Sequence, residues 1–240
     1  MNKTIWDIIT PTLTPHQLKW LESAPRMEYP FNREKKPELK PYYDKRQIFA
    51  PRQAGMTSYF IIEALAQALH KKQPQLYVCP SQNHINYAVH QLLYFAHKFQ
   101  IEVPRPKRHG SSQCFDFGNS AMLVFLLAQN INDTQLALDT KHRSCSFYHD
   151  VYHINEVEKP QKNETTTTVF TALPLPTDIL FLASKKQLKQ GFSNDKWFTH
   201  VTTINEVEDI PLDKKKLKNT ICQTKGEIEY QKAFEGFPPE

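Results

Sequence analysis

The sequence predicts an α/β fold with a mainly parallel sheet flanked by helices. Short apolar runs of strand length alternate with longer segments in which apolar residues recur at helical spacing. The order strand, helix, strand, helix favours parallel strands, because each helix returns the chain to the same edge of the sheet. The 240 residues are 40% hydrophobic, with 15 Phe and 10 Tyr, so the chain can bury a sizeable core.

The composition excludes several classes of protein. No stretch of about 18 apolar residues occurs, so we expect no membrane span and no membrane partner. The N-terminus, MNKTIWDIITPTLTPH, lacks the basic start and the continuous apolar stretch of a signal peptide, so we expect a cytoplasmic location. The four cysteines are scattered without a CxxC pair, which indicates reduced thiols rather than a structural zinc site. The formal net charge of +5 permits contact with nucleic acid without demonstrating it.

We predict two parts, residues 1–44 and residues 45–240. The first part begins with a helix, because TPHQ (residues 14–17) combines a Thr cap, a Pro at the first helical position and a Gln three residues after the cap. Residues 25–46 carry four prolines and many charges, which predicts an extended segment. The second part is the predicted α/β domain.

The strands and helices of the α/β domain are predicted from their apolar patterns. Helices are expected at 57–72, from 81 to 99 and, as a short final helix, at 226–234. Strands are expected at 47–50, 75–79, 145–150, 178–184 and 198–204, with a hairpin at 114–127 that turns at Gly118-Asn119. Residues 100–112 are expected to be a basic connection, and the polar composition of residues 156–168 indicates a mobile segment.

The stretch APRQAGMTS, residues 50–58, resembles a phosphate-binding loop between a strand and a helix. Such a loop directs backbone N–H groups at an anion, uses a lysine to reach the outer phosphates and uses a Ser or Thr to hold magnesium. The spacing from Ala50 to Gly55 fits this pattern, and so does Thr57. Ala50 nevertheless stands at the position of the first glycine, and Met56 stands at the position of the lysine. The nine residues taken alone favour a structural strand-to-helix turn.

Six short motifs occur in the order found in the ATPase domain of viral DNA-packaging motors, the terminase large subunit. Arg52-Gln53-Ala54-Gly55-Met56-Thr57 resembles the arginine-glutamine pair that precedes the Gly-Lys-Thr of that family. Five segments further along the chain resemble the later motifs of the family: LYVCPS (76–81), FDFGNSAML (115–123), the 143–150 segment ending in YHD, FLAS (181–184) and EYQKAFEG (229–236). At the last of these the family has a Phe-Glu-Gly strand.

The resemblance spans about residues 45–237 and implies a P-loop-ATPase-like fold. It also implies a nucleotide site, for which the candidate residues are Arg52, Gln53, Gly55 and Thr57. Residues 1–40 lack an obvious adenine-binding glutamine motif. Packaging terminases continue into a nuclease, whereas this sequence ends at Glu240, so we expect no cutting of DNA by this polypeptide.

Two departures from the family pattern bear on catalysis. Met56 has no charge, whereas the loop lysine binds and orients the phosphates. Arg52 either reaches in as a substitute or simply braces the loop. The acidic strand end should carry two adjacent carboxylates, one to organise magnesium and one to polarise water, but His149-Asp150-Val151 leaves only Asp150 as a catalytic remnant. His149 and His153 flank Asp150, but a strand end does not direct both side chains the same way, so we expect no metal site.

Two basic segments are candidates for contact with the phosphates of DNA, independent of base sequence. The alternative is that both are solvated loops. The candidate residues are Arg105, Lys107 and Arg108 in the first segment and Lys214, Lys215, Lys216 and Lys218 in the second.

We interpret the sequence as a terminase-ATPase-like chain whose catalytic apparatus has decayed, and which acts by binding without a cofactor. The expected partners are double-stranded DNA or a phage terminase, portal or replication protein, in the host cytoplasm if the chain is phage-encoded. One alternative is a weak or working packaging-type ATPase that uses ATP, magnesium, Arg52 and Asp150. Another is an α/β interaction protein unrelated to terminases.

Overall fold

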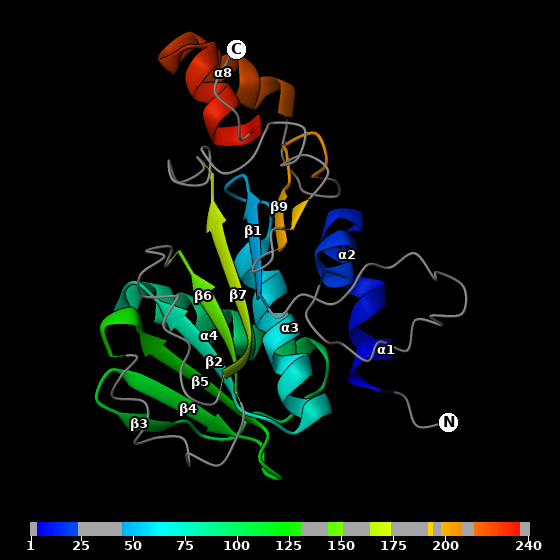
Figure 1. Ribbon diagram of the computed structural model, residues 1–240, viewed down its shortest axis with the longest axis vertical. Helices are drawn as coiled ribbons and strands as arrows, with labels where there is room; N and C mark the ends of the chain where they lie inside the picture. Colours follow the sequence, from blue (N-terminus) through cyan, green and yellow to red (C-terminus); the bar gives the residue numbers. More distant parts are fainter. Residues whose placement is uncertain are drawn as a thin grey trace.

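A computed structural model describes residues 4–23, 45–130, 144–150, 164–173, 192–193, 198–207 and 214–235. Nine strands form one sheet in the order β3-β4-β5-β2-β6-β7-β1-β9-β8 (Figure 1). The six strands from β5 to β9 in that order are mutually parallel, while β3, β4 and β8 are antiparallel to their neighbours. The predicted mainly parallel α/β sheet flanked by helices is therefore confirmed.

The strands are β1 Lys45–Ala50, β2 Gln75–Cys79, β3 Lys107–His109, β4 Ser112–Asp116, β5 Met122–Leu127, β6 Ser144–His149, β7 Glu164–Ala172, β8 Phe192–Ser193 and β9 Phe198–Val201. The helices are α1 Ile5–Ile9, α2 Pro15–Glu22, α3 Met56–Lys71, α4 Gln82–Lys98, α8 Lys214–Lys225 and α9 Glu227–Tyr230, followed by a π-helical turn at Gln231–Glu235. Short 3₁₀ turns occupy Thr10–Thr12 and Ala128–Asn130.

Both faces of the sheet are buried in its centre. Every residue of β2 is buried, as expected for a parallel strand that is covered on both sides. Tyr77 and Cys79 belong to the larger hydrophobic cluster, which includes residues of α3, α4 and the N-terminal helices. Leu76 and Val78, on the opposite face, belong to a smaller cluster with residues of β5, β6 and β7. This alternation follows from the two-residue period of a strand.

The N-terminal helix α2 packs against α3. The ring of Trp20 is fully buried and lies 5.3 Å from the ring of Tyr59 and 6.0 Å from that of Phe60, measured between centroids. Its indole Nε1 donates a hydrogen bond to the hydroxyl of Thr202 at 2.8 Å, beyond the end of β9. The capping box predicted from TPHQ is present, since Thr14 and Gln17 exchange bonds at the start of α2. Helix α2 is thereby fastened to two separate elements.

Several predictions were wrong in detail. Residues 164–168, expected to be mobile, lie in β7, because the ETTTTVFTA run is rich in β-branched residues that suit a strand. The Lys214–Lys218 segment is the start of helix α8 rather than a loop. Residues 107–109 of the expected basic connection form the edge strand β3. By contrast, the short final helix predicted at 226–234 is confirmed as α9 and the π-helical turn that follows it.

The remaining element predictions are confirmed or lie outside the described residues. Helices α3 and α4, strands β1, β2 and β6, and the β4–β5 hairpin occur within a few residues of their predicted positions, and the last predicted strand ends early, at Val201. The strand expected at 178–184 falls outside the described residues, and so does the extended segment predicted at 25–46 except for its last two residues, which begin β1. Among the described helices, none is long and apolar enough to cross a membrane.

Candidate functional site

The loop between β1 and α3 is a tight turn that leads directly into the helix. The amide of Ala54 donates to the carbonyl of Pro51 at 3.2 Å, which closes a turn whose Gln53 has φ +70°. Gly55 follows with φ +77° and is the residue that precedes the first turn of α3. Glycine tolerates this left-handed conformation and has no side chain that could cap the helix. The first-turn amides of α3 therefore face the loop with the positive end of the helix dipole behind them.

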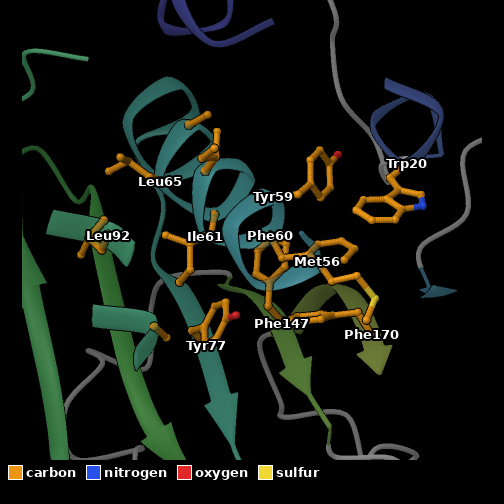
Figure 2. Close-up of a cluster of buried hydrophobic side chains, with 14 of the residues drawn as sticks. Trp20, Met56, Tyr59, Phe60, Ile61, Leu65, Tyr77, Leu92, Phe147 and Phe170 are labelled. Carbon is orange, nitrogen blue, oxygen red and sulfur yellow. The ribbon is translucent and has the colours of Figure 1, made fainter. Parts of the chain in front are cut away.

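The side chains of the loop divide into exposed and buried groups. Arg52 and Gln53 are exposed, and Thr57 is half-buried at the start of α3. Met56, at the position where a phosphate loop has its lysine, is only 9% exposed and belongs to the large hydrophobic cluster. Figure 2 shows its side chain beside Phe170. The residue that would carry the loop's charge instead fills the core beneath the loop.

Two residues of α2 that are not predicted as site residues lie directly against the loop. His16 Nε2 lies 3.0 Å from the carbonyl oxygen of Ala54, within hydrogen-bonding distance. Gln17 Nε2 lies 3.0 Å from the position that a Cβ atom on Gly55 would occupy. The only local signal at these positions was that of a helix start, because the approach of α2 to the loop depends on its packing against α3.

The end of β6 supplies the remnant carboxylate. Asp150 adopts φ +53°, and its Oδ1 accepts hydrogen bonds from the hydroxyl of Thr171 at 2.5 Å and from the amide of Ala172 at 3.3 Å. Its Oδ2 lies 3.7 Å from His149 Nε2 and 3.8 Å from His84 Nε2. Strand β7 lies between β1 and β6, and these bonds to β7 hold Asp150 at the same edge of the sheet as the loop.

His149 links the carboxylate to the loop. Its Nε2 lies 3.4 Å from the hydroxyl of Thr57, and its ring stacks on Phe170 at 4.7 Å between centroids. Burial lowers the pKa of His149 to about 4; Asp150 opposes this shift and His84 adds to it. The imidazole is therefore uncharged at neutral pH. The structure thus brings Thr57, His149 and Asp150 together, with Arg52 and Gln53 on the exposed side of the same loop.

The two basic segments lie at opposite ends of the long axis of the molecule (Figure 1). In the first, Arg105 and Arg108 are exposed, while Lys107 forms an ion pair with Asp116 at 3.3 Å. In the second, Lys215 and Lys216 are exposed on α8, and Lys218 Nζ lies 5.4 Å above the ring of Tyr230. The structure therefore does not bring the two segments into one patch.

The chain shares its fold with solved terminase structures, whereas no family model and no curated protein matches it. The large terminase ATPase domain of Thermus phage P74-26 matches with a TM-score of 0.52 and 9% identity, over 82% of this chain and 89% of that one. The large terminase of a thermophilic bacteriophage in complex with ADP matches with a TM-score of 0.54 and 14% identity, over 93% of this chain and 53% of that one.

The chain thus spans about half the length of the second structure, which is a longer terminase. The same thermophilic phage protein in another structure gives a TM-score of 0.55 at 14% identity. At these identities the likeness establishes the fold. The fold of this chain is that of the ATPase domain of phage large terminases, as the order of its motifs predicts.

Proposed function

We propose that this chain is a terminase-ATPase-like protein that acts by binding and does not hydrolyse ATP. Its partner in this proposal is duplex DNA or another component of a phage packaging or replication assembly. The fold that the chain shares with phage large terminases supports a role in such an assembly. The absence of hydrolysis is inferred from the chemistry of the loop and of the strand end beside it.

The observation that carries the proposal is the burial of Met56. A phosphate-loop lysine supplies a point charge that orients the outer phosphates and stabilises charge in the transition state. Met56 is 9% exposed within the hydrophobic cluster, so the position supplies neither a charge nor a donor to a phosphate. Loss of one charged partner at such a site typically costs about 3–4 kcal/mol of transition-state stabilisation.

The end of β6 supports the same conclusion. Organising magnesium and polarising the attacking water require two carboxylates, and the sequence His149-Asp150-Val151 offers only Asp150. The neighbouring His149 is uncharged at neutral pH and lies 3.4 Å from the Thr57 hydroxyl, the group that would hold magnesium in a working site. Magnesium prefers oxygen ligands, so an imidazole beside the threonine disfavours it.

The basic start of α8 supports a binding role. Lys214, Lys215 and Lys216 occupy the first turn of the helix, and all three oppose its dipole, which favours acidic side chains at that end. The helix dipole by itself therefore does not favour lysine at these positions. Binding of an anionic partner such as the DNA backbone does explain their placement, because the helix dipole and the lysines then attract the same phosphates.

An assay of phosphate release with and without duplex DNA tests the proposal. We expect release at the background rate under both conditions. Turnover of about one per second, the low end for ordinary enzymes, that is lost in Arg52→Ala would contradict it. That result would favour the alternative that Arg52 and Asp150 support a weak ATPase, an alternative that rests on the exposed position of Arg52 in the loop.

Met56→Lys provides the complementary test, with Met56→Leu as the matched control. If the loop keeps a phosphate-binding shape, the lysine variant should gain a rise in melting temperature on addition of ATP, and the leucine variant should not. The lysine should also lower stability by about 1–3 kcal/mol, because the position is buried. A folded lysine variant without any response to ATP would show that the loop no longer accepts a nucleotide.

A further inference from the structure

A group of nitrogen and oxygen ligand atoms lies beside the loop, and the sequence did not predict it. His84 comes from the first turn of α4, whereas His149 and Asp150 come from the end of β6. Asp150 Oδ2 lies 3.8 Å from His84 Nε2 and 3.7 Å from His149 Nε2, and the two imidazole rings meet edge to face with centroids 5.4 Å apart. The hydroxyl of Thr57 lies 3.4 Å from His149 Nε2.

The opposite atom of each of these groups already has a partner. His84 Nδ1 lies 2.7 Å from the hydroxyl of Ser81, and Asp150 Oδ1 accepts hydrogen bonds from Thr171 and Ala172. His149 Nδ1 lies 3.5 Å from the hydroxyl of Tyr77. Outer bonds of this kind orient metal-ligating histidines and carboxylates and leave the second atom directed at the ion. The arrangement leaves His84 Nε2, His149 Nε2 and Asp150 Oδ2 as the inner atoms.

We propose that His84, His149 and Asp150 bind one divalent transition-metal ion of the Zn²⁺ class, with the fourth position left to the Thr57 hydroxyl or to water. Two imidazoles and one carboxylate suit zinc and related ions, whereas magnesium selects oxygen ligands. Imidazole must be uncharged to bind a metal. This inference goes beyond the proposed function, because it concerns a different ligand and does not depend on ATP or DNA.

In their present positions, no three or more His, Cys, Asp or Glu side chains of the described segments could hold a metal ion, so the proposed site requires the inner atoms to move closer together. Tetrahedral Zn–N distances of about 2.0–2.1 Å place neighbouring ligand atoms about 3.3 Å apart. The distances from Asp150 Oδ2 to the two Nε2 atoms are 3.7 and 3.8 Å, so each of these two pairs must close by about half an ångström. His84 has a side chain that is 40% exposed and can make this movement, while His149 is held against Phe170.

Calorimetric titration of the whole chain with zinc chloride, after dialysis against EDTA, tests the proposal. We expect one equivalent of tightly bound zinc and at least 100-fold weaker binding of magnesium chloride. His84→Gln should weaken zinc at least tenfold, since loss of an outer-shell partner alone typically costs about 10–100-fold. The exposed position of His84 makes this variant compatible with folding. His90→Gln is the matched control, because His90 is exposed on the same helix, and we expect zinc affinity to stay unchanged.

Two further results decide whether bound zinc occupies this site. Asp150→Asn should also weaken zinc, with a circular dichroism spectrum matching the parent. Cobalt(II) added to the metal-free parent should give visible absorption bands of a low-coordinate site, and His84→Gln should lose them. Absence of stoichiometric zinc, or equal effects of His84→Gln and His90→Gln, would overturn the proposal; the second outcome would mean that zinc binds adventitiously at surface histidines. Neither outcome bears on ATP hydrolysis.

Discussion

At the scale of single residues, one uncharged side chain occupies the position at which the terminase pattern has a lysine, and a second lies next to the remaining carboxylate. Met56 is buried beneath the loop, and His149 is a buried imidazole next to Thr57. Both pack against the aromatic core: Met56 lies beside Phe170 (Figure 2), and the ring of His149 stacks on that of Phe170. The core has therefore extended into the site. This packing makes the site more hydrophobic, and the burial that it causes lowers the pKa of His149.

The stability of the protein should depend on His149 between about pH 6.5 and pH 4. The pKa of His149 is lowered to about 4 by burial in the folded protein, whereas an unfolded histidine titrates near about 6.5. Below about 6.5 the unfolded chain binds a proton that the folded chain does not, so this contribution is fully present above about pH 6.5 and is lost as the pH falls. The full loss amounts to about 3 kcal/mol.

Urea unfolding of the parent and of His149→Gln at pH 7 and pH 4.5, with EDTA present, measures this contribution. The parent should lose more stability than the variant between the two values, since both share the titration of every other group. Equal losses in the two proteins would show that the folded protein protonates His149 as readily as the unfolded chain does.

At the scale of elements, α2 determines the surroundings of the loop. His16 and Gln17 touch the backbone of residues 54 and 55 from one side. Gln17 is not free to withdraw, because its Oε1 accepts a hydrogen bond from the amide of Thr14 in the capping box. Gly55 is therefore constrained twice, by its left-handed φ and by the neighbouring helix.

Gly55→Ala should destabilise the protein more than Gly110→Ala. Both glycines have positive φ, which costs alanine about 1–2 kcal/mol, but a Cβ on Gly110 meets nothing within 4 Å. At Gly55 the Cβ would lie 3.0 Å from Gln17 Nε2, so we expect about 1 kcal/mol of additional loss. Urea titrations of both variants measure the difference. Adding Gln17→Ala to Gly55→Ala should recover that difference; no recovery would mean that α2 does not press on the loop.

Helix α8 should contribute most of any salt-dependent binding of DNA. If the protein neutralises about six phosphates, the log–log slope of affinity against salt is roughly −5. Replacing Lys214, Lys215, Lys216 and Lys218 by Ala should flatten that slope by about 3–4 and weaken all sequences alike. Fluorescence anisotropy with two duplexes of different sequence provides the measurement.

A double variant, Arg105→Ala with Arg108→Ala, should be compared with the α8 variant in the same binding assay. These residues lie at the opposite end of the molecule, so their effect should add to that of α8 without coupling. Because Lys218 also contacts Tyr230, Lys218→Ala alone controls for damage to the α8–α9 pair. Unmeasurable binding even at low salt would remove DNA as the partner and leave a protein component.

At the scale of the whole molecule, one buried arginine joins the N-terminal helix to the sheet. Arg46 of β1 is fully buried and pairs with Glu63 of α3. It also donates hydrogen bonds to the Trp20 carbonyl at 2.7 Å and to the Thr168 hydroxyl at 3.0 Å. These bonds connect β1 to α2 and to β7. Burial opposes its charge, but Glu63 and Tyr59 outweigh that effect and raise the pKa of Arg46. The arginine therefore remains charged inside the core.

Arg46→Met should cost about 3–5 kcal/mol of folding stability, because it leaves the Glu63 carboxylate buried without its partner. Combining it with Glu63→Leu should recover much of that loss, since both charges are then removed. Lys19→Met is the control: Lys19 belongs to α2, but its pair with Glu206 is exposed, so we expect at most about 1 kcal/mol. Calorimetric or urea unfolding measures all three. An Arg46→Met cost as small as that of Lys19→Met would contradict a structural role for the buried pair.

The sequence by itself determined the elements that carry their own local signal. The helical periodicity of α3 and α4, the apolar run of β2 and the position of Gly55 at the start of α3 all depend on neighbours a few residues away. The order of the short motifs pointed to the terminase ATPase fold, which the solved structures share. The basic start of α8 carried no such local signal, because three consecutive lysines look the same in a loop and in a helix.

Only the tertiary structure decided which side chains meet at the site. His84 reaches Asp150 because β2 lies next to β6, and Thr57 reaches His149 because β7 places the ends of β1 and β6 at one edge. The contact of α2 with the loop and the separation of the two basic segments depend on the same packing. These pairs lie far apart along the chain, and no local pattern specifies them. The order of the parallel strands in the sheet determines how close the side chains of each pair lie.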